Sequence, residues 1–207
     1  IVQTSNNRRT LAWTLDAFNQ VMETEVSFVG GYRIEEIVQA FPDISFSVNP
    51  NWDSQGPLGS LLAAPLARGQ TTYVCYSDIV ISEDIVRSLQ RVDSDVVIAS
   101  DRVWQHRYEG RSTEDLATAE KLRIQNDRVT ELSPLISLDE SDAEFVGIMK
   151  LSSRAVDCLT GLQERHRELA AHGMPRLVQE FISAGLEISP AEADGRWAEL
   201  NAPQDLA

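Results

Sequence analysis

Hydrophobic residues along the first half of the chain alternate between two spacings. Leu11, Leu15, Phe18 and Met22 recur every three or four residues, as on one face of a helix, whereas residues 72–76 form a short apolar run typical of a buried strand. By these patterns the predicted helices cover residues 10–24, 34–41, 58–66 and 85–89, and the predicted strands cover 26–29, 44–48, 72–76 and 95–99. This alternation predicts an α/β fold with a Rossmann-like, doubly wound, mostly parallel sheet and helices on both faces.

The second half departs from this alternation. Residues 121–124 and 128–132 are strand-like on either side of Asn126 and Asp127, which predicts a small hairpin insertion. A further strand is expected at 144–150, helices at 153–171 and 175–184, and a strand-like segment at 197–201. The chain shows no internal repeat and no convincing linker, so we expect one domain over residues 1–207.

The composition is that of an ordinary soluble protein, with 43% hydrophobic and 24% charged residues among 207. Lysine and arginine number 18 against 32 aspartates and glutamates, and a net charge of −14 argues against a nucleic-acid partner. No apolar run approaches the roughly 18 residues of a membrane span, and no signal-peptide pattern opens the chain. Cys75 and Cys158 lie in apolar segments, as buried free thiols do, which makes the cytoplasm the simplest expected location.

Polar residues follow several of the predicted strands. Gly30, Asn49, Asp78 and Asp101 fall just past four strand ends, where sheets of this class place their active sites. A carboxylate at the position of Asp78 could hold Mg²⁺ against the phosphates of a nucleotide, because this ion takes few carboxylates and keeps phosphate oxygens and waters. The alternative is that Asp78 only caps the helix that follows it.

Residues 101–111 interleave basic and aromatic side chains without a helical or strand period. Their three arginines, Arg111 among them, could bind an anionic group through the planar guanidinium. The alternative is a solvated loop anchored by Trp104. Lys121 and Lys150 stand at the edges of predicted strands and could neutralise phosphate charge, although surface lysines are commoner. The three histidines show no zinc spacing.

Several segments, taken in their order along the chain, resemble the nucleotidyltransferases that activate small phosphorylated molecules. These segments are Gly30-Gly31-Tyr32, Asn49-Pro50-Asn51-Trp52, Gly59-Ser60-Leu61, Tyr76-Ser77-Asp78-Ile79, Asp101, Glu120-Lys121, Glu144-Phe145-Val146-Gly147 and Trp197-Ala198-Glu199-Leu200-Asn201-Ala202-Pro203. The similarity covers nearly the whole chain and is closest to the cytidylyltransferases of the phosphocholine and phosphonate type. Some of these are fused to phosphoenolpyruvate mutase. The run Asp101-x-x-Trp104, Tyr108-x-x-Arg111 and Ala119-Glu120-Lys121 favours the phosphonate branch.

The resemblance implies a metal-dependent reaction in which an oxygen of a small phosphonate attacks the α-phosphorus of CTP and expels pyrophosphate. By motif position, Asp78 would hold Mg²⁺, and Asn201 stands where the family often carries a second metal-binding aspartate. Lys121 and Arg111 would be the catalytic cations that contact anionic oxygens. The resemblance also implies two binding sets: Gly30, Asn49, Ser60 and Asp78 for the nucleotide, and Asp101, Trp104, Tyr108 and Glu144 for the substrate.

The sequence departs from the family at its start. The family begins with a strand and a glycine-rich loop carrying basic residues, whereas this sequence enters at Asn6-Asn7-Arg8-Arg9, which match the end of that loop. We therefore expect the working protein to have a piece that this sequence lacks, and the resemblance leaves open an upstream mutase domain and a homodimer.

Two other functions compete with the phosphonate reading. One is a phosphocholine cytidylyltransferase, in which Trp52, Trp104 and Tyr108 could contribute to an aromatic cage for the quaternary ammonium. The other is a catalytically inactive module that still recognises a nucleotide or docks a partner enzyme.

Overall fold

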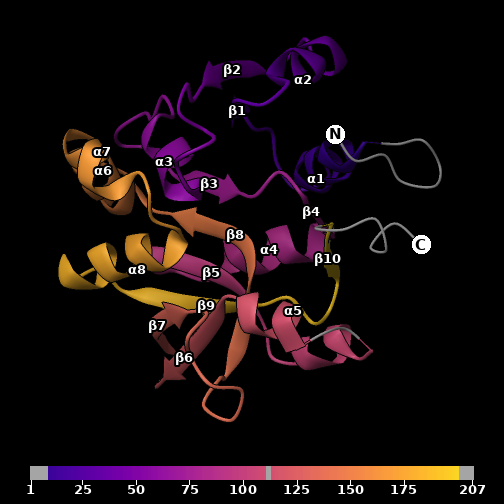
Figure 1. Cartoon of the computed structure of the whole chain (residues 1–207), viewed down its shortest axis with the longest axis vertical. Coiled ribbons are helices and arrows are strands. Elements are labelled where there is room, and N and C mark those ends of the chain that lie inside the picture. Colours follow the sequence, from indigo (N-terminus) through magenta and orange to yellow (C-terminus); the bar gives the residue numbers. More distant parts are fainter. Residues whose placement is uncertain (1–8, 111–112, 201–207) are drawn as a thin grey trace.

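The computed structural model describes residues 9–110 and 113–200, and its first half alternates helices with strands as the pattern predicts (Figure 1). The elements are α1 (Thr10–Asn19), β1 (Ser27–Gly30), α2 (Ile34–Ala40), β2 (Ser45–Val48), α3 (Pro57–Leu62), β3 (Thr72–Cys75), β4 (Ile79–Ile81), α4 (Glu83–Arg91) and β5 (Val96–Asp101). Of these, only β4 has no counterpart in the sequence prediction.

The second half contains the predicted hairpin and several elements that the pattern did not indicate. Its elements are η1 (Trp104–Tyr108), α5 (Thr113–Thr118), β6 (Lys121–Gln125), β7 (Arg128–Ser133), β8 (Ala143–Leu151), α6 (Ser153–Leu162), η2 (Gln163–Arg165), α7 (His166–Leu169), α8 (Met174–Ser183), β9 (Ile188–Glu192) and β10 (Trp197–Glu199). The long helix expected at 153–171 is interrupted by the 3₁₀ turn η2. The hydrophobic pattern does not predict η1, α5 or β9.

The central sheet has six strands in the order β7-β6-β8-β5-β9, with β3 also paired to β8. Both β3 and β5 run antiparallel to β8, so these two strands are parallel to one another. The sheet is mixed, however, and not mostly parallel as the sequence pattern predicts. Among the described strands only β5–β9 and β1–β2 pair in parallel, because β8 lies between β3 and β5.

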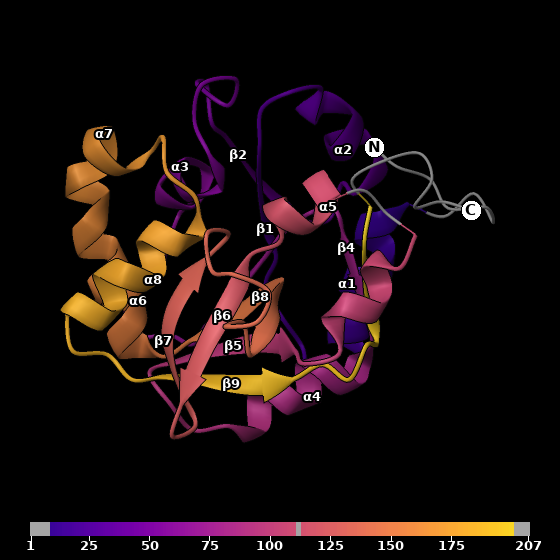
Figure 2. The ribbon, with the colours of Figure 1, turned by 60° about the horizontal axis from the view of Figure 1, so that its bottom comes forward.

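Helices cover both faces of this sheet (Figure 2). Along β5, Val96 and Ile98 pack into a core with α3, α6 and α8, whereas Val97 and Ala99 pack into a second core with α1 and α4. The strand is therefore buried along its whole length, which explains its continuous apolar sequence. The α/β class with helices on both faces of a central sheet is confirmed.

The strands β1 and β2 form a separate two-stranded parallel sheet, with Ser27 opposite Ser45 and Gly30 opposite Val48. In Figure 1 they lie near α2 at the top of the molecule, above β3. Within the described residues, β1 pairs only with β2 and β3 pairs only with β8.

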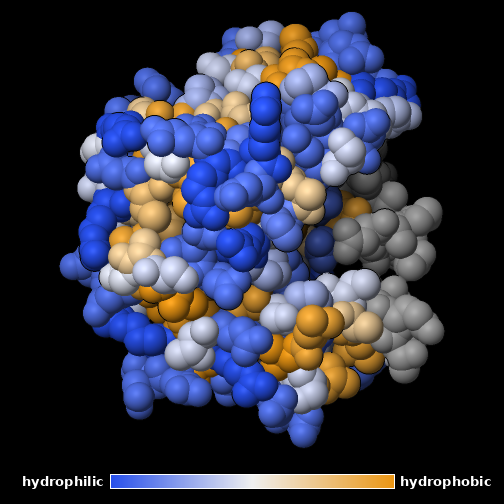
Figure 3. Space-filling view, turned by 60° about the vertical axis from the view of Figure 1, so that its left-hand side comes forward, coloured by the Kyte–Doolittle hydropathy of each residue, from blue (hydrophilic) through white to orange (hydrophobic). Residues whose placement is uncertain are grey.

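The outer surface has the polar character expected from the high share of charged residues in the composition. On the face drawn in Figure 3 hydrophilic residues predominate, and hydrophobic residues show in separate patches. Within residues 9–110 and 113–200, no helix has the length and apolar character needed to cross a membrane.

Candidate active site

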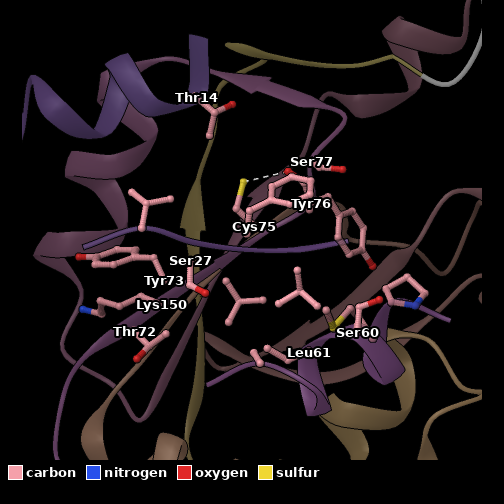
Figure 4. Close-up of a pocket in the computed structure, with 18 of the residues that line it drawn as sticks. Thr14, Ser27, Ser60, Leu61, Thr72, Tyr73, Cys75, Tyr76, Ser77 and Lys150 are labelled. Atoms are coloured by element: carbon pink, nitrogen blue, oxygen red, sulfur yellow. Dashed lines mark hydrogen bonds between the residues drawn. The ribbon is translucent and has the colours of Figure 1, made fainter. Parts of the chain in front are cut away.

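A cavity of about 1900 Å³ lies against β1, β3 and β8. Its walls include Leu11 and Leu15 of α1, Ser60 and Leu61 of α3, and the segment 144–147 of β8. Figure 4 shows Thr14 on one side and Ser60 with Leu61 on the other, and the strand residues between them. Four of the predicted site residues line this cavity: Ser60, Asp78, Tyr108 and Glu144.

Carboxylates from distant parts of the chain line the cavity near Tyr76: the charges of Glu120, Glu199 and Asp78 act on its hydroxyl, and the charge of Glu199 acts on Glu144. We call this set, Asp78, Glu120, Glu144 and Glu199, the acidic end. Asp78 follows β3, and its carbonyl oxygen accepts a hydrogen bond from the Leu200 amide at 2.9 Å, which fastens the segment after β10 to the end of β3. Burial raises the pKa of the Asp78 carboxyl, so a cation beside it would relieve the cost of its charge.

The acidic end suits a metal that takes few protein ligands. In the part of the chain that the structure describes, no group of three or more His, Cys, Asp or Glu could hold a metal ion. Asp78 would supply one carboxylate to such a metal, and Mg²⁺ commonly completes a site with few carboxylates with waters and phosphate oxygens. The second predicted ligand, Asn201, and the predicted catalytic Arg111 lie outside the described residues.

Two tyrosines each donate a hydrogen bond to a glutamate at this end. The hydroxyl of Tyr76 donates to Glu120 Oε2 at 2.8 Å, and that of Tyr108 donates to Glu144 Oε1 at 2.6 Å. Burial, together with the charge of Glu199, raises the pKa of both glutamates to about 7. This outweighs the lowering effect of the tyrosine hydroxyls and, for Glu144, of the Arg107 charge. Each carboxyl thus keeps its proton to a higher pH than an exposed glutamate does.

Glu144 has one carboxyl oxygen without a partner. The residue is only 2% exposed, and its Oε2 makes no hydrogen bond, although the side chain lines the cavity. A buried acceptor left unpaired costs about 1–3 kcal/mol, and more when it is charged. The site therefore favours a ligand that brings a donor to this oxygen.

Gly147 allows the ring of Tyr76 to reach its position. Its φ is +87°, and a Cβ on this residue would lie 2.9 Å from the Tyr76 ring. The same ring meets Phe145 edge-on, with the two ring centroids 5.8 Å apart. A glycine at this point of β8 is thus required both by backbone conformation and by the close approach of the ring.

Asp101 and Trp104 lie behind the cavity wall. Asp101 is fully buried, and its two oxygens accept hydrogen bonds from Trp197 Nε1 at 2.8 Å and from the Val103 amide at 2.9 Å. Trp104 is 1% exposed and packs edge-on against Tyr108. Neither residue lines the cavity, whereas Trp197 and Tyr108 do, so the structure places this predicted pair in supporting positions.

Most of the basic groups singled out by the sequence are engaged elsewhere. Lys121 is 2% exposed and donates through Nζ to the carbonyl oxygens of Ala119 at 3.1 Å and Leu116 at 3.4 Å, and its burial lowers the pKa of the amine. Lys150 lines the cavity and donates to the Val92 carbonyl at 2.5 Å.

The two described arginines of the 101–111 segment also contact protein groups. Arg102 forms an ion pair with Glu192, and the Arg107 guanidinium lies over the ring of Trp197, 3.5 Å from its centroid. Neither arginine lines the cavity.

Gly30 and Asn49 order the loop that leads to Ser60. The carbonyl of Gly30 accepts from the Asn49 amide at 2.8 Å. The side chain of Asn49, which is 1% exposed, accepts from the Asn51 amide and donates to Ser60 Oγ at 3.2 Å. Of these residues only Ser60 reaches the cavity.

Tyr76, Glu120 and Glu199 line the cavity but are not among the predicted site residues. Tyr76 and Glu120 stand beside predicted residues and within segments that carry the resemblance, which is the signal that could have found them. Their pairing could not be inferred, because nothing local in the sequence brings residues 76, 120 and 199 together.

No family model matches the sequence, and no curated protein matches it. Solved structures do. The inositol-1-phosphate CTP transferase from T. maritima aligns with a TM-score of 0.73 over 98% of this chain and 80% of its own, at 14% identity. The nucleoside-diphosphate-sugar pyrophosphorylase from Vibrio cholerae RC9 aligns with a TM-score of 0.68 over 99% of this chain and 87% of its own, at 10% identity. The chain has the nucleotidyltransferase fold. At these identities the similarity concerns the fold, and the substrate must be argued from the site.

Proposed function

We propose that this protein is a Mg²⁺-dependent cytidylyltransferase that joins CMP from CTP to a small phosphonate and releases pyrophosphate. The nucleotidyltransferase fold, the cavity beside the strand ends and the position of Asp78 support this function. The observation that carries the choice of substrate is the unpaired, buried Oε2 of Glu144 within the acidic end.

The reaction requires the two reactants to be positioned against one another and does not require a proton transfer. A phosphonate oxygen is anionic at neutral pH and can attack the α-phosphorus of CTP without a general base. A new P–O bond forms, the bond from the α-phosphorus to the bridging oxygen breaks, and its electron pair leaves with pyrophosphate. Mg²⁺, held by Asp78, would supply positive charge to the phosphate oxygens.

The charge of the lining favours a substrate with a cationic group. Lys150 is the only basic side chain among the described residues that line the cavity, against four carboxylates at the acidic end. An ammonium group could donate to Glu144 Oε2, and the ring of Tyr108 in the same wall suits a cation. We therefore propose an aminoalkylphosphonate as the substrate class.

A matched pair of substrates tests this proposal. With CTP and Mg²⁺, pyrophosphate release should be at least tenfold faster in kcat/KM for 2-aminoethylphosphonate than for ethylphosphonate, which lacks the amine. Equal rates would contradict the role of Glu144. Preferential turnover of phosphocholine would favour the phosphocholine cytidylyltransferase.

The metal assignment is tested by Asp78→Asn. This variant should lose at least a hundredfold in rate, since it removes the charge that holds Mg²⁺. Asp53→Asn, in an exposed loop, is the matched control and should retain the rate. An unchanged rate in Asp78→Asn would show that this carboxylate does not hold the metal.

A second candidate is a nucleotide-binding module without activity. It is favoured by the cavity lining, in which Lys150 is the one basic side chain among the described residues, since a triphosphate needs counter-charge. Thermal unfolding distinguishes the two. Stabilisation by CTP and Mg²⁺ without pyrophosphate release would support the module.

A further inference from the structure

The strand β2 forms an open edge of the small sheet that it makes with β1. The Ser45 amide donates to the Val26 carbonyl at 3.0 Å, so the backbone groups of Ser45 and Ser47 face β1. Because successive residues of a strand point their N–H and C=O groups to opposite sides, those of Phe46 and Val48 point away from β1. Among the described residues β2 pairs only with β1, so these outward groups have no strand partner.

The open edge carries no charge. Residues 26–32 and 44–52, which contain β1, β2 and the turns that follow them, include no Lys, Arg, Asp or Glu, although 24% of the chain is charged. Edge strands commonly carry a charge, a proline or a bulge that prevents pairing with another chain. Within Ser45–Val48 there is neither a charge nor a proline, and the register with β1 is regular. This edge therefore lacks the usual protection against strand addition.

Exposed hydrophobic side chains accompany the open edge. Val48 is 59% exposed, and Tyr32 and Trp52, whose ring centroids lie 5.3 Å apart, are 69% and 45% exposed. In Figure 3 hydrophobic residues gather at the top of the molecule, where Figure 1 places α2 and β2. Apolar side chains exposed beside an unpaired strand are typical of a surface that binds another protein chain.

The two faces of β2 differ in polarity. Phe46 stands opposite Phe28 in the register with β1, and the centroids of the two rings lie 6.2 Å apart. Val48 shares this face with Phe46, because side chains alternate along a strand, and Ser45 and Ser47 carry the other face.

A second copy of β2 fits this edge by symmetry. When two such strands lie antiparallel about a two-fold axis at Ser47, Phe46 of one chain stands opposite Val48 of the second copy, and the converse also holds. The outward N–H and C=O groups of these residues would then exchange hydrogen bonds on both sides of the axis. Phe46 and Val48 of both chains would form one apolar cluster on the same face.

The charge of the chain restricts where a second copy can approach. With a net charge of −14, two copies repel one another over most of their surfaces. This repulsion is weakest where neither copy carries charge, as along β2. A basic partner would instead be attracted to the acidic surfaces elsewhere, so the uncharged edge favours a second copy of this chain.

We propose that this protein forms a two-fold symmetric dimer in which the β2 strands of two copies pair antiparallel and join the two small sheets into one continuous sheet. The contact is the same patch on both copies, as a two-fold interface requires. This inference does not depend on the proposed reaction.

Disulfide trapping at the two-fold axis tests the proposed register. Ser47→Cys places a thiol opposite its own copy in a non-hydrogen-bonded pair, where the Cα atoms lie about 4.5 Å apart, within reach of a disulfide. Ser45→Cys is the matched control, because its two copies would stand roughly 13 Å apart along the strands, beyond that reach. Both variants also carry Cys158→Ala, which removes the half-buried thiol of α6.

Sedimentation of the wild type should show a dimer that dissociates on dilution. At a concentration where the dimer predominates, mild oxidation should link Ser47→Cys at least tenfold more than Ser45→Cys. A wild type that stays monomeric at every concentration would overturn the proposal. A dimer in which the two cysteine variants are linked equally, or not at all, would also overturn it, because the contact would then lie on another surface.

A charge placed on the edge provides the second test. Val48→Lys should weaken dimerisation at least tenfold, because two lysines would then lie on one face close to the axis. Leu135→Lys, at a residue that is 91% exposed and follows β7, is the control and should leave the dissociation constant unchanged. Equal effects of the two lysines would contradict pairing through β2.

Discussion

At the scale of single residues, burial of carboxyl groups is the dominant effect in the cavity. The two pairs Tyr76–Glu120 and Tyr108–Glu144 each combine a good hydrogen bond with a raised pKa, since a hydroxyl donor replaces only part of the lost water. Burying these carboxyl groups therefore lowers the stability of the unliganded protein. A ligand with a positive charge would remove part of that cost on binding.

Because the Glu144 carboxylate is buried, the stability of the protein should depend on pH. Its pKa rises from 4.5 to about 7 on folding, so between these pH values the folded state binds more protons and the free energy of unfolding falls as pH rises. Glu144→Gln keeps the acceptor for Tyr108 without the charge. We expect this variant to gain about 1–3 kcal/mol over the wild type at pH 8 and little or nothing at pH 4.

Urea unfolding from pH 4 to pH 8 measures this difference. The same substitution at the exposed Glu164 serves as the control and should leave the pH profile unchanged. A constant difference between Glu144→Gln and the wild type across this range would contradict the burial argument.

Gly147 should tolerate no side chain. Gly147→Ala combines a φ of +87° with a Cβ only 2.9 Å from the Tyr76 ring, and we expect a loss of about 3 kcal/mol or more in the free energy of unfolding. Gly69→Ala is the matched control, because its φ of +77° is similar and nothing lies within 4 Å of the added Cβ. The control should lose about 1 kcal/mol, the cost of φ alone. Equal losses in urea unfolding would show that the approach of Tyr76 does not matter.

At the scale of elements, the β6–β7 hairpin shows how far local sequence can determine a structure. The predicted turn residues Asn126 and Asp127 both adopt the left-handed region, with φ of 51° and 57°, and Gln125 pairs with Arg128 across them. This two-residue connection matches the twist of the flanking strands. The predicted hairpin is therefore confirmed.

The same turn offers a stabilising substitution. Asp127→Gly should raise the free energy of unfolding by about 0.5–1 kcal/mol, because glycine adopts positive φ without a steric cost. Asp43→Gly, at an exposed turn residue that does not have positive φ, should instead lose stability. Thermal unfolding of both variants tests this, and a loss in Asp127→Gly would contradict it.

At the scale of the whole molecule, the cavity is assembled from segments far apart in the chain. The end of β3, the residues just before β6, the first half of β8 and the strand β10 all contribute to it. The bond from Trp197 Nε1 to the buried Asp101 and that from the Leu200 amide to Asp78 hold the last of these in place. The acidic end therefore depends on the docking of the C-terminal segment.

Disrupting the docking of the C-terminal segment should lower the free energy of unfolding. Trp197→Phe leaves one oxygen of the buried Asp101 without its donor and removes a surface on which Arg107 lies, so we expect a loss of about 2 kcal/mol in the free energy of unfolding. Trp52→Phe, at a site that is 45% exposed, should lose less than about 1 kcal/mol. Chemical denaturation of the two variants provides the comparison, and equal losses would show that the indole N–H contributes little.

The sequence by itself determined the elements whose periods are local: the helices and strands of the first half other than β4, and the hairpin. These elements follow from the backbone preferences of their residues and from the spacing of the apolar residues that are buried away from water. Only the tertiary structure decided that β8 separates β3 from β5, that Glu120 and Glu144 each bind a tyrosine, and that Asp101 and Lys121 are buried in supporting positions. Pairing between distant segments depends on burial and on the partners available there, and neither is encoded within a short window of sequence.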